Sequence, residues 1–549
     1  METFTSILEF LTYWLVDQYW FPAFLIGSGI FFTFYLGFPQ IKFFKHGWKV
    51  LSGQYLKEDT QGETTPFQAL TTALSGTVGT GNIGGVALAI FLGGPAAIFW
   101  MWVTAFFGMT TKYVEVTLAH KYRETLPDGS ISGGPMYYIE NGLNMKWLAI
   151  LFSICLLLMC LGTGNMPQIS SIAVVMNDTF NIPKFITGSV LAVLLWMVII
   201  GGIKRIAQIA SKLVPFMAFW YITGSLAVIF TNYENIIPSL QSIFVHVFTP
   251  TAAVGGFLGA SVAAALTRGV NRGLYSNEAG QGSAPIAHAS SKTENPIEEG
   301  MVSILEPFID TIVICTITGL VILSSGVWTE KFDNKFEESS MCFLNQPLTD
   351  KSEKDIAVLK DYIYSCTGDL KHSGSLTIKE GKPQETNFTL LHNRSVAENV
   401  TVFDEDSGIF NGKINIRNGK LDSPNVYIVG ESLLIGADLT GKAFTRSVFG
   451  EYGQYIVAIG LLLFAFSTAI AWSYYGDRAT AHLFGEGWIL YYRIIYVGAF
   501  FTAAIIDTKI VWDIATVIGP IATIPNLLAL ILLRKEIKKI QTDYQESLP

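Results

Sequence analysis

The stretch Gly76-Thr77-Val78-Gly79-Thr80-Gly81-Asn82 interrupts an apolar run that is otherwise long enough to cross a membrane. Glycine and polar residues unwind a helix at such a place, and unwound backbone is tolerated in a bilayer only where protein buries it or it lines a cavity. A second polar stretch, Arg268-Gly-Val-Asn-Arg-Gly-Leu-Tyr-Ser-Asn-Glu-Ala-Gly280, interrupts another apolar run farther along the chain. A matched pair of broken helices predicts a transporter whose binding site lies between the two breaks.

The composition is typical of a polytopic membrane protein. Of 549 residues, 50% are hydrophobic and 15% are charged, against roughly 25% charged in an average soluble domain. The net charge of -8 does not indicate nucleic-acid binding, because much of the acid lies in residues 330–451. Hydropathy predicts about eleven membrane-spanning helices. They cover residues 20–38, 67–91, 95–118, 147–168, 185–201, 213–230, 252–289, 301–327, 453–475, 488–505 and 511–533.

Lysine and arginine concentrate on alternate loops, and short cytoplasmic loops are the ones enriched in them. This asymmetry predicts a protein of the inner or plasma membrane with its N-terminus outside and its C-terminus, which carries Arg534 and Lys535, in the cytoplasm. The hydrophilic segment 328–449, called the insert below, then lies outside, and its turn signals favour a small β-rich unit. Cys342 and Cys366 are expected to form a disulfide in that oxidising compartment, with two free thiols as the alternative.

Ten of the predicted spans fall into two sets of five, and each set begins with a broken helix. An odd number of spans makes the two sets cross the membrane in opposite senses, which is the topology of an inverted repeat. The fold class is therefore all-α, apart from the insert. The predicted domains are an N-terminal helix and linker (1–60), a first repeat (61–250), a second repeat (251–327 and 450–535), the insert (328–449) and a cytoplasmic tail (536–549).

The first break exposes main-chain groups of both polarities. The carbonyls of Ser75, Thr77 and Val78 suit an ammonium or a hard cation such as Na+, which replaces its hydration shell with oxygens. The N–H groups near Thr80 and Gly81 begin the outer half-helix, and its positive dipole end suits a carboxylate. One break can therefore hold both ends of an α-amino acid.

Two other interpretations of this glycine-rich stretch are weaker. The residues 79–84 match GxGxxG, but that fingerprint indicates a dinucleotide only after a strand in a βαβ unit, and both flanks here are apolar helix. Close helix packing explains the small residues but not Asn82 and the two threonines.

The second break supplies Tyr275, Asn277 and Glu278. An ionisable residue at membrane depth is a functional candidate by default. Glu278 is expected either to bind an ion or proton or to pair structurally with Arg272 or Arg268, and the sequence leaves both open.

The ninth predicted span carries two adjacent hydroxyls, Ser467 and Thr468, with Trp472 one turn beyond on the same face. Back-bonding of each hydroxyl to a carbonyl of the preceding turn is the ordinary state of such residues. Beside a break that suits a cation, however, the two hydroxyl oxygens are able to complete an oxygen shell.

These motifs resemble the alanine or glycine:cation symporter family, also called sodium:alanine symporters. The likeness runs from about Phe67 to Leu533 without the insert, which is not typical of that family, and Gln281 departs from its pattern. The motifs that carry it are Ser75-Gly-Thr-Val-Gly-Thr-Gly-Asn-Ile-Gly-Gly-Val-Ala87, Gly94-Pro-Ala-Ala-Ile-Phe-Trp-Met-Trp102, Gly133-Gly-Pro-Met-Tyr-Tyr138, Ser276-Asn-Glu-Ala-Gly280 with Gly282-Ser-Ala-Pro285, and Trp472-Ser-Tyr-Tyr-Gly476.

The resemblance implies a leucine-transporter-type fold and sodium-coupled symport of alanine or glycine, with Na+ as coupling ion and no organic cofactor. It implies that Trp472 closes the pocket, so that only small side chains enter. The expected substrate-binding residues are Thr77, Thr80, Gly81, Asn82, Gln168, Tyr275, Asn277 and Trp472. The expected Na+ ligands are the carbonyls of Ser75 and Val78 and the hydroxyls of Ser467 and Thr468.

The rival hypotheses are a proton-coupled amino-acid transporter that uses Glu278, and a channel or sensor whose external insert binds a ligand. An enzyme is the weakest hypothesis, because neither a metal cluster nor a nucleophile with its base is visible. The sequence indicates no particular protein partner for the insert.

Overall fold

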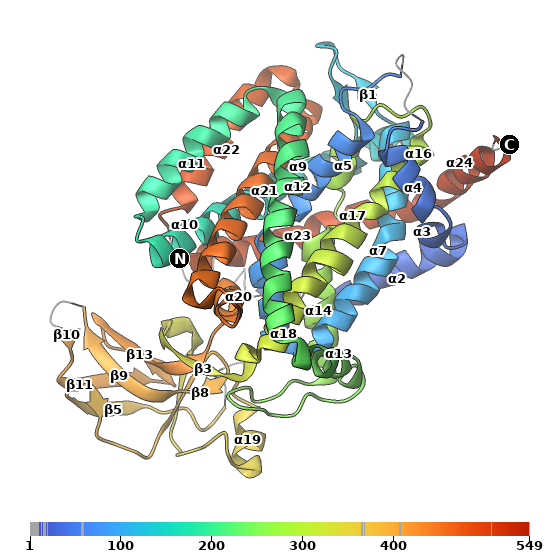
Figure 1. The fold of residues 1–549 in the computed structure, drawn as a ribbon. Helices are drawn as coiled ribbons and strands as arrows, with labels where there is room; N and C mark the ends of the chain where they lie inside the picture. Colours follow the sequence, from blue (N-terminus) through green and yellow to red (C-terminus); the bar gives the residue numbers. More distant parts are fainter. Residues whose placement is uncertain are drawn as a thin grey trace.

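The computed structural model describes residues 10–12, 14, 18, 20–55, 60–363, 366, 368–405, 408–506 and 508–547, with the backbone alone over 508–516. A helical body carries a smaller β-rich unit at one end (Figure 1). Figure 1 shows the strands of residues 331–433 gathered beside the ends of α13 (Ile236–Val245) and α18 (Thr316–Ser325), while α5 (Pro66–Thr77), α16 (Pro296–Ser303) and α24 (Arg534–Ser547) lie toward the opposite end.

The helical body is built from two parts of the chain. The first part contains α2 (Trp20–Leu36), α3 (Pro39–Lys42), α4 (Phe44–Leu51), α5 (Pro66–Thr77), η2 (Gly81–Gly85), α6 (Val86–Gly93), α7 (Ala96–Lys121), α8 (Pro135–Tyr137), η3 (Tyr138–Gly142), α9 (Lys146–Gly162), α10 (Met166–Phe180), α11 (Lys184–Ile199), α12 (Gly202–Thr231), η4 (Tyr233–Asn235) and α13 (Ile236–Val245), with a short β1 (Glu124–Thr125) and β2 (Ile131–Ser132) pair. The second part contains α14 (Val262–Asn277), α15 (Ala284–His288), α16 (Pro296–Ser303), α17 (Leu305–Pro307), η5 (Phe308–Cys315), α18 (Thr316–Ser325), η6 (Val327–Thr329), η8 (Gly450–Tyr452), α21 (Gly453–Phe484), η9 (Glu486–Trp488), α22 (Ile489–Ala503), α23 (Thr508–Leu532) and α24 (Arg534–Ser547).

Most predicted spans coincide with helices, within a few residues at each end. Four helical runs of the described part are long and apolar enough to cross a membrane: Lys146–Phe180, Gly202–Thr231, Pro296–Ser325 and Gly450–Phe484. Two bent pairs also qualify as single spans: Pro66–Thr77 with Gly81–Gly93, and Val517–Leu532 with Arg534–Ser547. The number of about eleven spans therefore stays a prediction, as does the inverted repeat.

The first predicted break is present. A capping box between Thr65 and Gln68 starts α5, which ends at Thr77. Val78 then adopts an extended conformation (φ -77°, ψ 93°), and the chain resumes as a helix at Gly81 after a bend of 57°. The resumed helix begins as the π-helical turn η2, a form that is frequently found at functional sites.

The second break lies later than the sequence predicts. Residues 252–261 are not helical, and α14 runs without interruption from its Ser261 cap to Asn277. The glycines at 269 and 273 lie within the continuous helix. They allow close packing on α7, because a side chain there would collide with Ala97 and with Thr104. The true break is 278–283, where Glu278, Gly280 and Gly282 all take positive φ angles.

Three other boundaries differ from prediction. The fourth span, expected to end at Gln168, is interrupted at 163–165 and continues as α10 to Phe180. Helix α12 begins at Gly202, well before the predicted 213, because hydropathy does not register its polar first turns. The tail predicted over 536–549 is mostly helical, because α24 begins at Arg534 and continues to Ser547.

The insert is β-rich, as predicted, and every strand pairing in it is antiparallel. Its three sheets have the strand orders β10-β9-β13-β3, β12-β11-β5-β6 and β4-β7-β8. The predicted disulfide between Cys342 and Cys366 is confirmed. The elements are β3 (Lys331–Lys335), η7 (Glu338–Ser340), β4 (Met341–Leu344), α19 (Glu353–Leu359), β5 (Gly374–Lys379), β6 (Lys382–Pro383), β7 (Thr389–His392), β8 (Ser395–Val396), β9 (Glu398–Asp404), β10 (Gly408–Ile409), β11 (Gly412–Arg417), β12 (Lys420–Leu421), β13 (Val426–Leu433) and α20 (Gly436–Thr445).

Candidate functional site

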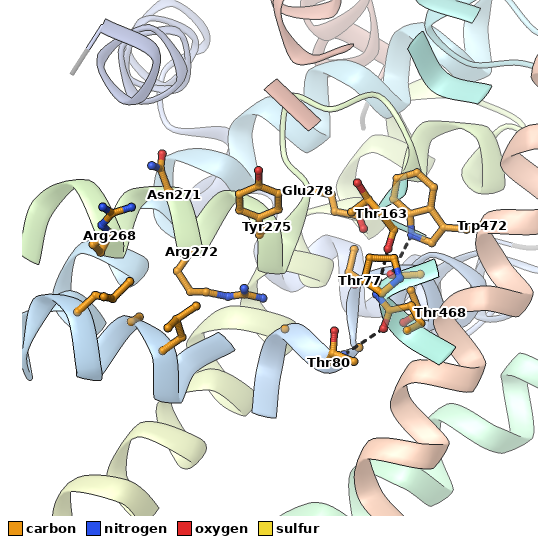
Figure 2. Close-up of a pocket in the computed structure, with 18 residues that line it drawn as sticks. Thr77, Thr80, Thr163, Arg268, Asn271, Arg272, Tyr275, Glu278, Thr468 and Trp472 are labelled. Atoms are coloured by element: carbon orange, nitrogen blue, oxygen red, sulfur yellow. Dashed lines mark hydrogen bonds between the residues drawn. The ribbon is translucent and has the colours of Figure 1, made fainter. Parts of the chain in front are cut away.

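A cavity of about 220 Å³ lies between the two broken helices. Its walls come from the first break (76–81), from α6, from the start of α10, from α14 and from α21. Figure 2 shows Trp472 and Thr468 at one end of the cavity and Arg268 and Asn271 at the other. The cavity is small compared with the roughly 300–1,000 Å³ of common ligand pockets.

The four expected Na+ ligands lie together beside the break. Thr468 Oγ1 donates to the Val78 carbonyl (3.3 Å), and Ser467 Oγ lies 3.5 Å from the Ser75 carbonyl oxygen. Both hydroxyls also lie within hydrogen-bonding distance of the Phe464 carbonyl, at 2.8 and 3.0 Å. Each hydroxyl therefore lies close both to a carbonyl of the preceding turn of α21 and to a carbonyl of the break. Each hydroxyl has one proton, so its lone pairs remain able to bind a cation.

The amino end of the outer half-helix faces the cavity near Gln168. The Thr80 N–H donates to Gln168 Oε1 (3.3 Å), and Gln168 Nε2 donates to the Thr163 carbonyl (3.2 Å). Gly81 and Thr77 also line the cavity, on the two sides of the break. The residues on both sides of the break, which carry backbone carbonyls before it and N–H groups after it, thus border the same cavity.

Trp472 closes one end of the cavity. Its side chain is fully buried, and its indole N–H donates to the Gly76 carbonyl over 3.2 Å. The Trp472 side chain packs against Gly164, where any side chain would collide with it. The indole is therefore held from two sides, which makes it a rigid wall.

Two expected residues point away from the cavity. Asn82 Nδ2 donates to Asp310 Oδ1 (2.6 Å), while its Oδ1 accepts from the Gly79 N–H (2.9 Å). Asn277 Nδ2 donates to Thr311 (3.2 Å). Neither asparagine belongs to the cavity wall, whereas Tyr275 does. Asn82 instead fixes the shape of the break through Gly79.

Three polar residues on one face of α14 line the cavity and were not among the expected binding residues: Arg268, Asn271 and Arg272. The guanidinium of Arg272 lies against Gly81 and Gly85, where a Cβ would meet it. Their spacing of three and four residues places them on the face that also carries Tyr275, and this periodicity was the available signal.

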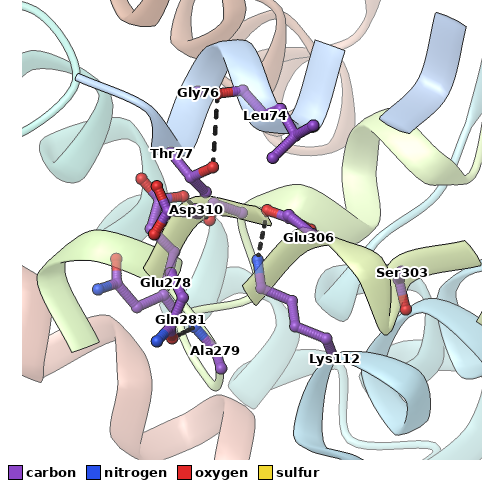
Figure 3. A network of polar contacts seen from close by, with 12 residues as sticks. Leu74, Gly76, Thr77, Lys112, Glu278, Ala279, Gln281, Ser303, Glu306 and Asp310 are labelled. Carbon is purple, nitrogen blue, oxygen red and sulfur yellow. Dashed lines mark hydrogen bonds and ion pairs between the residues drawn. The ribbon is translucent and has the colours of Figure 1, made fainter. Parts of the chain in front are cut away.

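The acidic residues behind the cavity are held by defined partners (Figure 3). Glu278 lines the cavity and accepts a hydrogen bond from Ser283 at 2.5 Å. Lys112 pairs with Glu306 at 3.0 Å, and both side chains are fully buried. Glu115 accepts from the backbone N–H groups of 280 and 282, so it secures the second break.

Comparison with known proteins places this chain among transporters. A model of the sodium:alanine symporter family matches residues 1–352 and 425–549, and thus leaves out 353–424 within the insert. The sodium/alanine symporter AgcS of Methanococcus maripaludis is 36% identical over 516 residues, covering 93% of this chain and 90% of that one. A transporter of Haemophilus influenzae is 35% identical over 527 residues, covering 95% and 92%. The probable sodium/glutamine symporter GlnT of Bacillus subtilis is 39% identical over 304 residues, covering 55% and 62%.

The family match spans both broken helices and the helix that faces them. Its coverage and the two relatives aligned over nearly the full length leave one conclusion. This chain is a multi-pass membrane protein that belongs to the sodium:alanine symporter family.

Proposed function

We propose that this protein couples the uptake of alanine or glycine to Na+ by alternating access. The proposal rests on one observation, the contact between the first break and α21. The carbonyls of Ser75 and Val78 lie beside the hydroxyls of Ser467 and Thr468. Four neutral oxygens suit a hard monovalent ion. The relatives named as sodium symporters support the same ion.

We assign the amino acid to the end of the cavity that lies next to the proposed Na+ site. Its carboxylate would accept from the N–H groups of Thr80 and Gly81, at the positive end of the outer half-helix. Its ammonium would donate to the Thr77 carbonyl. Gln168, already bonded to the Thr80 N–H, would orient the carboxylate, and Tyr275 would form the opposite wall.

Steric exclusion selects the side chain. The cavity ends at the ring of Trp472, which is held against the Gly76 carbonyl, and we assign to this end a substrate with a hydrogen or methyl group at the α-carbon. One relative is named for alanine and another for glutamine, so substrate size varies among such proteins. We assign the small substrate here because the indole is held by the Gly76 carbonyl and packed against Gly164.

Coupling follows from the shared backbone. An ion that binds the carbonyls of the break orders the same segment that the amino acid uses, so each ligand raises the affinity for the other. Alternating access would arise from the two five-helix sets acting as an inverted repeat. In the proposed orientation the N-terminus and the insert are outside, and the C-terminus is cytoplasmic.

The decisive experiment is uptake of radiolabelled alanine into proteoliposomes. We expect concentrative uptake with an inward Na+ gradient, none with an equal K+ gradient, and competition by glycine but not by leucine. Flux without accumulation would contradict symport, and accumulation of leucine or glutamine alone would contradict the substrate assignment.

Proton coupling is the second candidate, because the carboxyl of Glu278 lines the cavity. It predicts uptake driven by an inward pH gradient in sodium-free buffer, and loss of that uptake in Glu278→Gln. Sodium coupling predicts no uptake under those conditions, so the same vesicles decide between the two ions.

A further inference from the structure

The insert reaches the outer half of the first broken helix. Arg394 donates through one guanidinium nitrogen to the carbonyls of Phe91 (2.9 Å) and Leu92 (2.8 Å). These carbonyls belong to the last turn of α6, where the helix itself offers them no partner. The same guanidinium lies 5.6 Å from the centre of the Phe91 ring. A cation at a helix C-terminus also opposes the negative dipole end.

The turn that presents Arg394 is conformationally unusual. Asn393 and Arg394 form the two-residue loop between β7 and β8, and both have positive φ angles (45° and 57°). A type I′ hairpin requires this, but glycine or asparagine is the common choice for it. An arginine held in the left-handed region is uncommon and indicates a position fixed by its contacts.

A second part of the insert holds the beginning of the same half-helix. Thr440 of α20 donates to the Ile83 carbonyl (3.1 Å) within η2, and Gly84 allows α20 to approach closely at Ala437. A small hydrophobic cluster joins the end of α6 to strand β13. It consists of Phe91, Phe257, Ala260 and Leu433. The insert therefore contacts the half-helix formed by η2 and α6 at both of its ends.

This half-helix forms one wall of the cavity. It carries Thr80 and Gly81 at its start and Leu88 and Leu92 on its cavity face, and Leu88 is 38% exposed. The bend at the break is the natural pivot, because Val78 has left the helix. A half-helix tied to the insert at Arg394 cannot swing across the cavity without releasing that contact.

We propose that Arg394 is a positioning residue that latches η2 and α6 in the place that leaves the cavity accessible at Leu88. Closure of the cavity then requires the guanidinium to leave the Phe91 and Leu92 carbonyls. The family model leaves out the residues that contain Arg394, so membership of the family does not by itself imply the latch. It rests on the proposed alternating access, but its test needs no transport.

The test uses Leu88→Cys as a reporter in the purified full-length protein, labelled with a hydrophilic maleimide. The three free cysteines, Cys155, Cys160 and Cys315, are buried, and the parent protein gives the background. With Arg394 present, Na+ and alanine should slow the labelling by closing the cavity. In Arg394→Ala, labelling without ligand should already be slower by about two- to tenfold, as expected for a shifted two-state equilibrium.

Matched variants separate the latch from general damage. Arg394→Lys keeps a cationic donor and should restore part of the rate. Thr440→Val removes the hydrogen bond to the Ile83 carbonyl and should also slow the labelling. Arg417→Ala removes an exposed arginine of the same insert, paired with Asp422, and should change nothing.

Unchanged or faster labelling of Leu88→Cys in a folded Arg394→Ala protein would overturn the proposal. A variant that fails to fold is replaced by Thr440→Val, for which an unchanged rate has the same meaning. Slower labelling in Arg417→Ala would also overturn it, because the effect would then not depend on the contact with α6. If alanine is not the substrate, only the ligand-dependent slowing is lost, so the two failures are distinguishable.

Discussion

Thr468 Oγ1 lies 3.3 Å from the carbonyl oxygen of Val78, although 390 residues separate the two in the sequence. The hydroxyl belongs to a continuous helix, and the carbonyl belongs to the point where another helix is broken. A side chain of the regular helix α21 thus provides a hydrogen bond to the irregular backbone at Val78. Irregular backbone at membrane depth needs such support, because lipid offers it no hydrogen bonds.

Removal of the Thr468 hydroxyl should weaken sodium dependence more than substrate selectivity. Thr468→Ala deletes one of four proposed oxygen ligands, and we expect the half-saturating Na+ concentration to rise about tenfold, equivalent to ~1.4 kcal/mol. Alanine uptake measured against Na+ concentration checks this. Ser473→Ala is the control, because that hydroxyl donates within α21 to Ile470. Unchanged sodium activation in Thr468→Ala would remove Thr468 from the site.

Truncation of Trp472 should admit larger amino acids. Trp472→Ala opens the end of the cavity, and leucine should then compete with alanine at roughly tenfold lower concentration, since an apolar group in a pocket discriminates by about 10–200-fold. Competition assays in vesicles measure this. Trp488→Ala, at a tryptophan that is 56% exposed, should leave the competition profile as it was. The same result for Trp472→Ala would contradict its role as the wall.

Loss of one member of the Lys112–Glu306 pair should be strongly destabilising. Both side chains are fully buried and lie 3.0 Å apart, and leaving one buried charge alone costs about 3–5 kcal/mol. Glu306→Gln should lower the thermal unfolding midpoint by several degrees, and Lys112→Met combined with Glu306→Leu should recover part of it.

The exposed pair Arg417–Asp422 provides the comparison for that experiment. Its double alanine variant should change stability by less than about 1 kcal/mol, as for other surface ion pairs. Equal effects at the two pairs would mean that burial does not set the cost.

The insert should lose stability in mild acid because of His392. Burial lowers the pKa of His392 from 6.5 to about 3; its ring stacks on Phe336 and its Nδ1 bonds to Ser432 Oγ at 2.7 Å. The unfolded insert binds a proton near pH 6.5 and the folded one does not, so stability is full above pH 6.5 and falls from there toward pH 3. The slope is at most about 1.4 kcal/mol per pH unit.

Hydrogen exchange of insert amides, followed between pH 7 and pH 4, checks this prediction after correction for intrinsic rates. His392→Gln should flatten the pH dependence, whatever it does to stability at neutral pH. An equally steep loss of protection in that variant would assign the acid sensitivity to other groups.

The sequence alone was sufficient for the helical body and for the first break. Apolar runs reveal spans, and the glycines and threonines of 76–82 are unfavourable in an uninterrupted span. It was insufficient for the second break, because Gly269 and Gly273 carry the same local signal. There, glycine serves close packing of α14 on α7, and the helix continues. Local composition cannot distinguish the two uses of glycine, since the partner helix decides.

The binding-site assignments divide in the same way. Gln168 and Trp472 line the cavity, and the proposed Na+ ligands lie together at the break. Asn82 has the composition of a binding residue but points toward Asp310. Its backbone position follows from the sequence, whereas the direction of its side chain depends on an acceptor 228 residues away.

What the sequence by itself determined is therefore local and cumulative: the apolar spans, the place where the first helix unwinds, the β-rich insert and membership of a family. What only the tertiary structure decided is which groups meet across the chain. The position of Arg272 against Gly81, the contact of Thr468 with Val78 and the reach of Arg394 to α6 are of this kind. The physical reason is that hydropathy and backbone preference act over a few residues, while a hydrogen bond acts only when packing brings its two atoms within about 3 Å.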